Sequence, residues 1–339
     1  MDKTVPLGPD PIGIIFRKAA LFWPLFLYIR GMKSVSIIIP TFNGCGLLKE
    51  YLPHTYDVIS HSREVSDYEI IVIDDASTDD TAAYIRDTGI PNLIYLSNDS
   101  NSGFSKTINK GIGQARMELC LLLNNDMDIP QDFFEKTVPF MADDSVFGVC
   151  TEIRDRAAEK VIEGRKLPCM VHRELYFKET TEVGDGLTLY LCGGNALVDT
   201  RKLQELNGFN ELFSPFFYED YDLSLRALRK GWKSLYTDRT FCRHTPSSTI
   251  RKENETNFIG VVTRRNRILL TYLHNGTWDN LILLVKVYVK YLFAKVSKKP
   301  GKRHFIDVAH EFYRVRKDAA ACKKEEYKKL GKLDLTVFR

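Results

Sequence analysis

The stretch VSIIIP, residues 35–40, is a continuous apolar run that is rich in β-branched residues and ends at a proline. Such a run is typical of a strand buried on both faces of a parallel sheet. Similar runs follow it, and helical patterns separate them. The expected strands are residues 35–40, 68–74, 92–97 and 119–123, and the expected helices are residues 46–60, 77–87 and 104–115. This alternation predicts an α/β fold with a Rossmann-like, mostly parallel central sheet flanked by helices.

Beyond residue 130 the alternation loosens. Residues 152–186 are charged and lack periodicity, which predicts a long loop or a small hairpin. Residues 187–199, LTLYLCGGNALVD, predict strand material interrupted by a Gly-Gly pair. Residues 218–231 predict a helix, because acidic residues in its first turn and basic residues in its last complement the helix dipole, and Gly231 follows its end.

Polar clusters follow the predicted strands. NNDMD, residues 124–128, comes directly after the fourth strand, and two explanations are open: a turn, or a site for a hard divalent cation with Asp126 as an oxygen ligand. Ligands of such sheets bind beyond the carboxyl ends of the strands. The position of Asp126 therefore favours the metal site.

A second cluster, DDASTDD at residues 74–80, follows the second strand. Either Asp74 caps the next helix and Asp75 is solvated, or Asp75 accepts hydrogen bonds from a base or a ribose. The sequence has no GxGxxG after the first strand and no GxxxxGKS anywhere, which disfavours a dinucleotide site or a P-loop. A bound nucleotide diphosphate would then need a divalent cation to neutralise it.

Bulk composition is that of a soluble globular protein, with 44% hydrophobic and 27% charged residues in 339. The seven cysteines are scattered and form no CxxC pair, which favours a reducing compartment over a disulfide framework or a zinc site.

Charge and apolar residues gather near the two ends of the sequence. Residues 286–339 contain 16 Lys and Arg against 6 Asp and Glu, which suggests an anionic partner such as a membrane surface. Residues 278–303 predict a basic amphipathic helix, lying either in a membrane interface or on the catalytic domain with its lysines in water. Residues 12–30 are apolar but interrupted by Arg17 and Lys18, which favours an interfacial helix or docking arm over a spanning helix.

Six motifs of this chain occur in the order and spacing of family 2 glycosyltransferases, and about residues 34–270 resemble that family. The motifs are VSIIIPTFNG, IIVIDDASTDDT, NSGFSKTINKGI, LLLNNDMDIP, CGGNALVD and FNELFSPFFYEDYDLSLRALRKGW. The resemblance implies a GT-A fold, an inverting transfer from a nucleotide-diphosphate sugar, and Mn²⁺ or Mg²⁺ as cofactor. Within the family, the chain looks most like bacterial rhamnosyltransferase-like enzymes of cell-surface polysaccharide synthesis.

The resemblance also implies a role for each motif. Asp220 would be the catalytic base, and Asp126 would bind the metal, with His244 as a further metal ligand. The implied nucleotide-sugar-binding residues are Pro40, Thr41, Phe42, Asp75, Asn101, Gly103, Phe104, Asn109, Asn125 and Gly194. Asn124 departs from the family, since many relatives carry aspartate there, and a neutral ligand predicts weaker binding of free metal.

Elementary electrostatics adds two expectations to these roles. Asp220 in a first helical turn should have a lowered pKa and be ionised near neutral pH. Arg264, Arg265 and Arg267 would either contact a diphosphate or an anionic acceptor, or lie on a solvated helix face.

Four domains are expected: an N-terminal apolar arm (1–33), a nucleotide-sugar-binding half (34–130), an acceptor-binding half (131–270) and a basic helical extension (271–339). The expected partners are a nucleotide-diphosphate sugar (UDP or dTDP, with dTDP-rhamnose as one candidate), a glycan or polyprenyl-linked acceptor and an anionic membrane, but no nucleic acid. The expected location is cytoplasmic, with peripheral attachment to the inner face of the cytoplasmic membrane. The alternatives are a non-catalytic sugar-nucleotide-binding relative, which Asn124 prompts, and a pyrophosphorylase, which PTFNGCG disfavours because it lacks a basic residue.

Overall fold

The computed structural model describes residues 31–180, 182–245, 256–297 and 300–338. Residues 33–339 form one compact unit, to which every element named below belongs. The strands are β1 (Lys33–Thr41), β2 (Val65–Asp74), β3 (Leu93–Ser97), β4 (Leu119–Leu123), β5 (Met127–Asp128), β6 (Val146–Asp155), β7 (Val161–Glu163), β8 (Lys166–Val171), β9 (Glu174–Glu179), β10 (Gly186–Leu187), β11 (Asn195–Asp199) and β12 (Lys233–His244). The α-helices are α2 (Cys45–His61), α3 (Thr81–Asp87), α4 (Phe104–Gln114), α5 (Phe133–Thr137), α6 (Thr200–Glu205), α7 (Glu219–Arg229), α9 (Thr256–His274), α10 (Thr277–Val296) and α11 (Pro300–Glu325). The short 3₁₀ helices are η1 (Val138–Ala142), η2 (Glu211–Phe213), η3 (Tyr327–Lys329) and η4 (Thr336–Phe338).

The central sheet runs in the order β10-β12-β6-β11-β4-β1-β2-β3, with β5 paired to β12 and β7 paired to β6. β3, β2, β1 and β4 are parallel to one another, and β12 is parallel to β6. β11 lies antiparallel between β4 and β6. The predicted α/β class with a mostly parallel central sheet is therefore confirmed.

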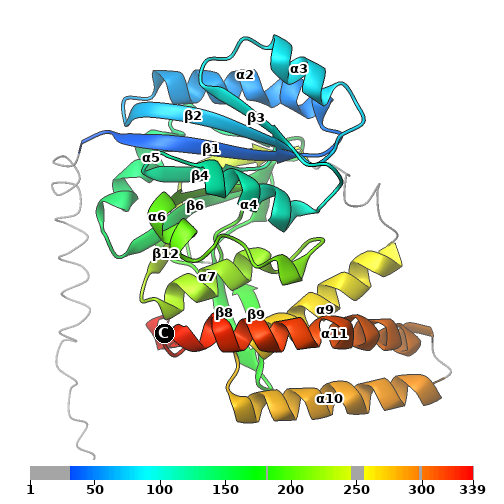
Figure 1. Ribbon diagram of the computed structural model, residues 1–339. Helices are drawn as coiled ribbons and strands as arrows, with labels where there is room; N and C mark the ends of the chain where they lie inside the picture. Colours follow the sequence, from blue (N-terminus) through cyan, green and yellow to red (C-terminus); the bar gives the residue numbers. More distant parts are fainter. Residues whose placement is uncertain (1–30, 181, 246–255, 298–299, 339) are drawn as a thin grey trace, which may run out of the picture. The chain divides into compact units, whose positions relative to one another are not determined.

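Side chains of the central strands alternate between two apolar cores, as the period of two in a strand requires. Ile37 belongs to the core under α2 and α3, whereas Ile38 belongs to the core under α4 and α6. Figure 1 shows these helix pairs on opposite faces of the sheet. Gly111 lets α4 approach closely, since a Cβ there would lie 2.5 Å from Ile73 Cδ1.

β5 and β12 together bring two distant segments to one end of the sheet. His244, at the end of β12, pairs with Met127, and Arg243 pairs with Asp128. The segment that follows β4 is therefore held next to His244, although more than a hundred residues separate them in sequence. This pairing is not visible in the local sequence pattern.

Two local predictions need correction or choice. The helix expected to begin at Ser77 begins at Thr81, because the Ser77 N–H donates to Asp74 and the Ser77 hydroxyl accepts from the Asn43 N–H. Of the two predictions for residues 152–186, the hairpin is the correct one. β8 and β9 form it as a separate two-stranded sheet.

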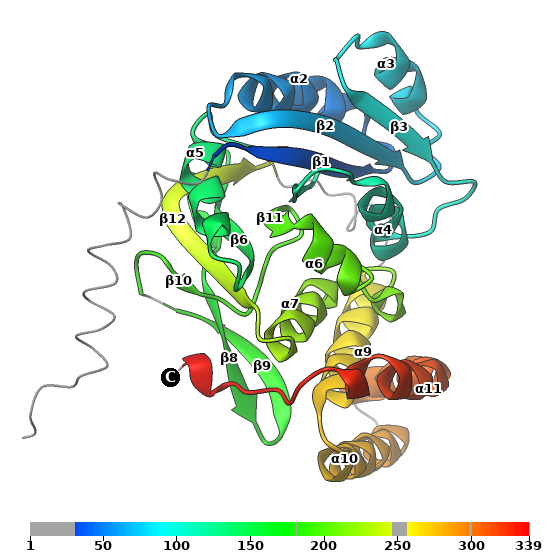
Figure 2. The same ribbon diagram turned by 60° about the vertical axis from the view of Figure 1, so that its left-hand side comes forward.

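The C-terminal part is helical, as expected, and packs against the rest of the unit. Figure 2 shows α9 beside α7, with α11 and α10 below them. Leu269, Ala319 and Tyr327 share one core with Phe213, which precedes α7. The central sheet contains strands from both predicted halves, residues 34–130 and 131–270. The predicted boundary between these halves stays a prediction. The predicted apolar stretch 12–30 lies outside the described residues.

Candidate active site

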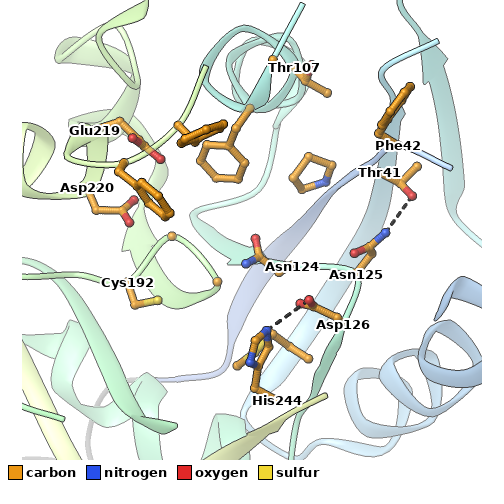
Figure 3. Close-up of a pocket in the computed structure, with 18 of the residues that line it drawn as sticks. Thr41, Phe42, Thr107, Asn124, Asn125, Asp126, Cys192, Glu219, Asp220 and His244 are labelled. Atoms are coloured by element: carbon orange, nitrogen blue, oxygen red, sulfur yellow. Dashed lines mark hydrogen bonds and ion pairs between the residues drawn. The ribbon is translucent and has the colours of Figure 1, made fainter. Parts of the chain in front are cut away.

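A cavity of about 700 Å³ lies at the carboxyl ends of β1, β2 and β4. Twelve of the thirteen site residues expected from the sequence line it. They are Pro40, Thr41, Phe42, Asp75, Asn101, Gly103, Phe104, Asn125, Asp126, Gly194, Asp220 and His244. Figure 3 shows the carboxylates of Asp126 and Asp220 on opposite sides of this one cavity, with the glycine-containing loop that follows Cys192 between them.

The thirteenth residue, Asn109, does not line the cavity. Its side-chain N–H donates to the Phe209 carbonyl oxygen (2.8 Å), and its Oδ1 accepts from the Phe209 N–H (2.8 Å). Both ends of the amide are therefore engaged by the backbone before η2. The side chain of Asn109 therefore ties α4 to this loop, and its contact with a nucleotide stays a prediction.

The floor of the cavity next to β1 is polar. Asn125 donates from Nδ2 to the Thr41 hydroxyl (2.8 Å), so the end of β1 and the segment after β4 are directly joined. A Cβ on Gly44 would lie 2.3 Å from Asn125 Nδ2 and 2.4 Å from Thr41 Oγ1. A side chain at position 44 would therefore displace this polar pair.

Asp75 is buried and shapes the loop before α4. Its Oδ1 accepts from the Ser102 N–H (2.8 Å) and from Asn98 Nδ2 (2.8 Å), and its Oδ2 accepts from the Gly103 N–H (2.9 Å). Gly103 adopts φ = 81°, which glycine tolerates without strain. The solvated alternative for Asp75 is excluded, since the residue is only 5% exposed. Base binding by Asp75 stays a prediction.

Asp126 and His244 form a pair at the other side of the cavity. His244 Nε2 lies 3.1 Å from Asp126 Oδ2, while Asp126 Oδ1 is buried without any hydrogen-bond partner. Burial lowers the pKa of His244, but the hydrogen bond to Asp126 and its negative charge outweigh burial and raise the pKa above its ordinary value. An orphaned carboxylate oxygen beside an imidazole fits a cation ligand set, although no cluster of three His, Cys, Asp or Glu side chains occurs among the described residues.

Asp220 and Glu219 enter the cavity from the first turn of α7. Burial raises the pKa of Asp220 well above its ordinary value, and the negative charges of Glu219 and Glu163 add to this. Burial also raises the pKa of Glu219 to about 7. The expectation of a lowered pKa for Asp220 is wrong, because desolvation outweighs the helix N-terminus.

The Gly193–Gly194 turn lies against the side chains of Asp220 in α7 and of Asn124 in the segment after β4. A Cβ on Gly193 would lie 2.7 Å from Asp220 Oδ1, and a Cβ on Gly194 would lie 3.0 Å from Asn124 Nδ2. The Asn124 N–H also donates to the Gly194 carbonyl oxygen (3.2 Å). The turn therefore fixes the spacing between α7 and the segment after β4.

The sequence did not identify the residues that hold α7 in place. Asn266, fully buried in α9, donates from Nδ2 to the carbonyl oxygens of Phe213, Phe216 and Phe217. Arg265 donates to the carbonyl oxygens of residues 212 and 214. Neither alternative for Arg265 is therefore correct, since it is only 3% exposed and its guanidinium binds backbone rather than solvent or a diphosphate.

Asp222 anchors α7 from below. Its carboxylate accepts from Arg226 Nε (2.7 Å) and from the Tyr327 hydroxyl, and it lies 2.9 Å from His274 Nε2. Despite full burial, the charge of Arg226 and these hydrogen bonds hold the pKa of Asp222 below its ordinary value. Tyr327, in η3, therefore connects the C-terminal part of the chain to the helix that carries Asp220.

The sequence also did not identify the residues on the side of the cavity nearest β7. Ile162 and Glu163 of β7, Tyr190, and Phe216 and Phe217 before α7 all line the cavity. Phe217 adopts φ = 73° and remains 39% exposed. β7 lies in the stretch without periodicity, which gave no signal for its residues. Phe216 and Phe217 lie inside the motif at residues 209–232, but nothing in that motif marked them as residues of the cavity wall.

The profile of the family described as "Glycosyl transferase family 2" matches residues 36–206, just over half of the chain. The chain therefore belongs to glycosyltransferase family 2. A curated relative, the GalNAc(5)-diNAcBac-PP-undecaprenol beta-1,3-glucosyltransferase of Campylobacter jejuni, is 24% identical over 251 residues. The match covers 71% of this chain and 72% of the relative.

Solved structures with this fold include the mannosyltransferase PcManGT from Pyrobaculum calidifontis in complex with GDP-Man and Mn²⁺ (TM-score 0.53, 16% identity). That match covers 94% of this chain and 89% of PcManGT. Residues 1–349 of S. aureus TarS in complex with UDP-GlcNAc match with a TM-score of 0.54 and 15% identity, over 87% of this chain and 92% of that 1–349 chain. The predicted family and the GT-A fold are confirmed, and the protein is a glycosyltransferase.

Proposed function

We propose that the protein is an inverting, metal-dependent glycosyltransferase that moves a hexosyl or rhamnosyl group from a UDP- or dTDP-sugar to a glycan acceptor. The observation that supports this best is that Asp126 and Asp220 line the same cavity, with the Gly193–Gly194 turn between them. One carboxylate lies where a diphosphate would be held, and the other lies across the cavity from it. Such an arrangement suits displacement at an anomeric carbon.

The donor would occupy the side of the cavity formed by the end of β1 and the loop before α4. Pro40 and Phe42 offer apolar contact to a nucleoside, and Asp75 accepts N–H or O–H donors. A pyrimidine base presents such an N–H, which is why uridine and thymidine donors are preferred here. Asn101 and Gly103 would close over the nucleotide.

In the reaction, the bond between the anomeric carbon and the diphosphate oxygen breaks, and its electron pair leaves with the diphosphate. An acceptor hydroxyl oxygen forms the new bond from the opposite face, and its proton passes to the Asp220 carboxylate. General-base catalysis of this kind contributes roughly 10²–10⁴-fold. The raised pKa of Asp220 makes it a stronger base once ionised, and Glu219 tunes that pKa through its charge.

Asp126 and His244 would hold a divalent cation, Mn²⁺ or Mg²⁺, because the unpartnered Oδ1 of Asp126 and the imidazole of His244 face one cavity. When bound, such a cation neutralises the leaving diphosphate. Diphosphate and water oxygens would supply the remaining ligands. Asn124 supplies no charge here, so the diphosphate must help to recruit the cation.

The acceptor would be a polyprenyl-linked saccharide used in cell-surface polysaccharide synthesis. The name of the Campylobacter relative, which specifies an undecaprenol-linked acceptor, supports this class. The protein would act in the cytoplasm with peripheral contact to an anionic membrane. Among the helices in the described ranges, none combines the length and apolar composition that a membrane crossing needs.

Incubation of the full-length protein with UDP-, dTDP- and GDP-sugars tests this function. Slow release of the nucleoside diphosphate in Mn²⁺, lost on chelation and lost in Asp220→Asn, is the expected result. UDP or dTDP together with Mn²⁺ should also raise the Tm. A ligand at 100 times its Kd adds about 2.7 kcal/mol to the free energy of unfolding. Nucleotide binding without release or transfer from any donor would instead support the non-catalytic alternative, which Asn124 favours.

A further inference from the structure

α10 has two apolar faces, and only one of them is covered by protein among the described residues. Leu283 and Val287 share a core with Phe312 of α11 and Val261 of α9. The opposite face is exposed, and we name it the α10 apolar face. It consists of Trp278, Leu281, Ile282, Val285, Tyr288, Val289, Leu292, Phe293 and Val296.

The α10 apolar face is continuous along the whole helix. Its nine members follow one another at spacings of one or three residues, so they form one stripe on a helix of 3.6 residues per turn. Trp278, Phe293 and Val296 are 78%, 67% and 79% exposed, and no charged residue interrupts the stripe. Figure 1 shows α10 as the outermost helix of the C-terminal stack. An exposed stripe of this length is typical of a surface that binds a partner or a membrane.

Lysines border the stripe on both sides. Lys286 lies one turn after Ile282, at one edge, and Lys295 lies two turns after Tyr288, at the other edge. Lys286 Nζ donates to a backbone carbonyl oxygen, and Lys295 Nζ lies 4.8 Å from the centre of the Tyr291 ring. Neither contact supplies a carboxylate, so both side chains keep a positive charge available for an anionic partner.

We propose that the α10 apolar face docks into the interface of an anionic lipid bilayer, with α10 parallel to the membrane plane and Lys286 and Lys295 at the headgroups. An apolar stripe with cationic edges is the arrangement by which interfacial helices bind such membranes. Membrane docking is inferred from the residues of α10 alone. The purpose of docking, which is to bring the cavity to a lipid-linked acceptor, rests on the proposed function.

A second copy of the chain is a poorer occupant than a bilayer. Because lysines lie at both edges of the stripe, two α10 apolar faces packed against each other would bring lysines of the two copies together. Like charges placed side by side oppose such an interface. An anionic headgroup layer pairs with both edges at once.

Flotation of the full-length protein with vesicles tests this surface. Wild-type protein should bind vesicles of equal parts phosphatidylglycerol and phosphatidylcholine, and bind vesicles of phosphatidylcholine alone at least about tenfold more weakly. The double variant Leu281→Ser/Phe293→Ser should lose at least about tenfold of its partition onto the mixed vesicles. The matched control, Val183→Ser/Val337→Ser, removes two exposed apolar side chains elsewhere and should bind like wild type.

Depth of insertion gives a second readout. In a Trp23→Phe background, brominated lipids should quench Trp278, whereas Trp232, which stacks on Phe147, should not respond. Equal vesicle binding by wild type and the double variant would overturn the proposal, as would equal binding to neutral and anionic vesicles. So would a concentration-dependent dimer that only the double variant loses, since a second copy would then be the occupant.

The same preparations separate this inference from the proposed function. A thermal shift with UDP or dTDP and Mn²⁺ that persists in the double variant, together with lost vesicle binding, supports both. Vesicle binding without any nucleotide response would remove the proposed function alone. A nucleotide response without vesicle binding by wild type would remove the α10 surface alone.

Discussion

Gly193 and Asp220 are so close that no side chain fits between them: a Cβ on Gly193 would lie 2.7 Å from Asp220 Oδ1. Gly193→Ala must therefore displace the carboxylate or the turn. Because a misplacement of about 1 Å at a reacting group costs roughly 10²-fold, we expect kcat to fall by about that factor. The steady-state rate of transfer measures it.

Gly113 provides the control for this glycine. It lies in α4 with no atom within 4 Å of the position of an added Cβ. Gly113→Ala should keep full activity and gain about 0.5–1 kcal/mol of stability, because alanine has the higher helix propensity. Equal activity of both variants would show that the Gly193 contact is unimportant for catalysis.

Asp220→Asn should lower the rate of transfer by roughly 10²–10⁴-fold and leave donor binding nearly intact. It should also stabilise the fold at neutral pH. The folded-state pKa of Asp220 lies above the unfolded value, so ionisation of this carboxyl weakens folding as pH rises through that raised pKa, and asparagine removes the loss. Activity and thermal unfolding at pH 5 and pH 8 measure both effects.

The exposed Asp87→Asn, at the end of α3, is the control for Asp220→Asn. It should change neither transfer nor the pH dependence of Tm. An Asp220→Asn enzyme that turns over normally would remove Asp220 from the mechanism.

Glu219→Gln should move the pH dependence of the reaction. The negative charge of Glu219 raises the pKa of Asp220, so removing it should shift the rise of kcat/KM to lower pH. Burial raises the pKa of Glu219 from 4.5 to about 7, which implies a stability loss on the order of 3 kcal/mol that accumulates as pH rises from about 4.5 to about 7. Glutamine should abolish that loss, and calorimetry from pH 5 to pH 8 tests it.

A role for Glu219 that is merely structural predicts a different outcome. In that case Glu219→Gln lowers kcat at every pH without moving the profile. The position of the rise in kcat/KM therefore distinguishes tuning of Asp220 from support of α7.

Asp126→Ala should weaken the cation dependence of donor binding. With one carboxylate ligand removed, the thermal shift produced by nucleoside diphosphate should no longer increase when Mn²⁺ is added. His244→Ala should have the same effect to a smaller extent. Titration of Mn²⁺ at fixed nucleotide measures both.

Asp128→Asn is the matched control, two residues further along. The Asp128 carboxylate lies 3.4 Å from His54 Nε2 rather than on the cavity wall, so its loss should leave the Mn²⁺ response unchanged. If Asp126→Ala keeps the full Mn²⁺ effect, the cation is held elsewhere.

Asn266→Asp should be more damaging than its single-atom change suggests. The Asn266 side-chain N–H groups serve three backbone carbonyl oxygens before α7, and a buried carboxylate would repel all of them. Loss of at least about 3 kcal/mol is expected, since unsatisfied buried groups each cost about 1–3 kcal/mol. The exposed Asn257→Asp, in the same helix, should be neutral by urea unfolding.

Most of the fold and much of the cavity wall could be predicted from the sequence, because both depend on local order. Each buried strand can be predicted from its apolar run. The carboxyl ends of parallel strands lie at the same edge of the sheet. Asp75 and Asp126 can therefore be placed at the same cavity without any knowledge of side-chain contacts.

The remaining features depend on contacts between distant residues. Asn109 is engaged by Phe209, 100 residues away, and Arg265 by backbone 51 and 53 residues away. The raised pKa of Asp220 arises from burial, which is set by how β11 and α7 pack. No local pattern encodes such partners, so a helix-dipole argument alone gave the wrong direction for this pKa.

The Tyr327 hydroxyl donates a hydrogen bond to the Asp222 carboxylate, so α7 depends on a residue close to the C-terminal end of the sequence. Asp222 is completely buried and follows Asp220 by two residues, yet one of its partners comes from more than a hundred positions later. A nascent chain that ends before this tyrosine would lack one of the partners of Asp222 in α7. The hydrogen bonds of Asp222 are therefore complete only after Tyr327 has been synthesised.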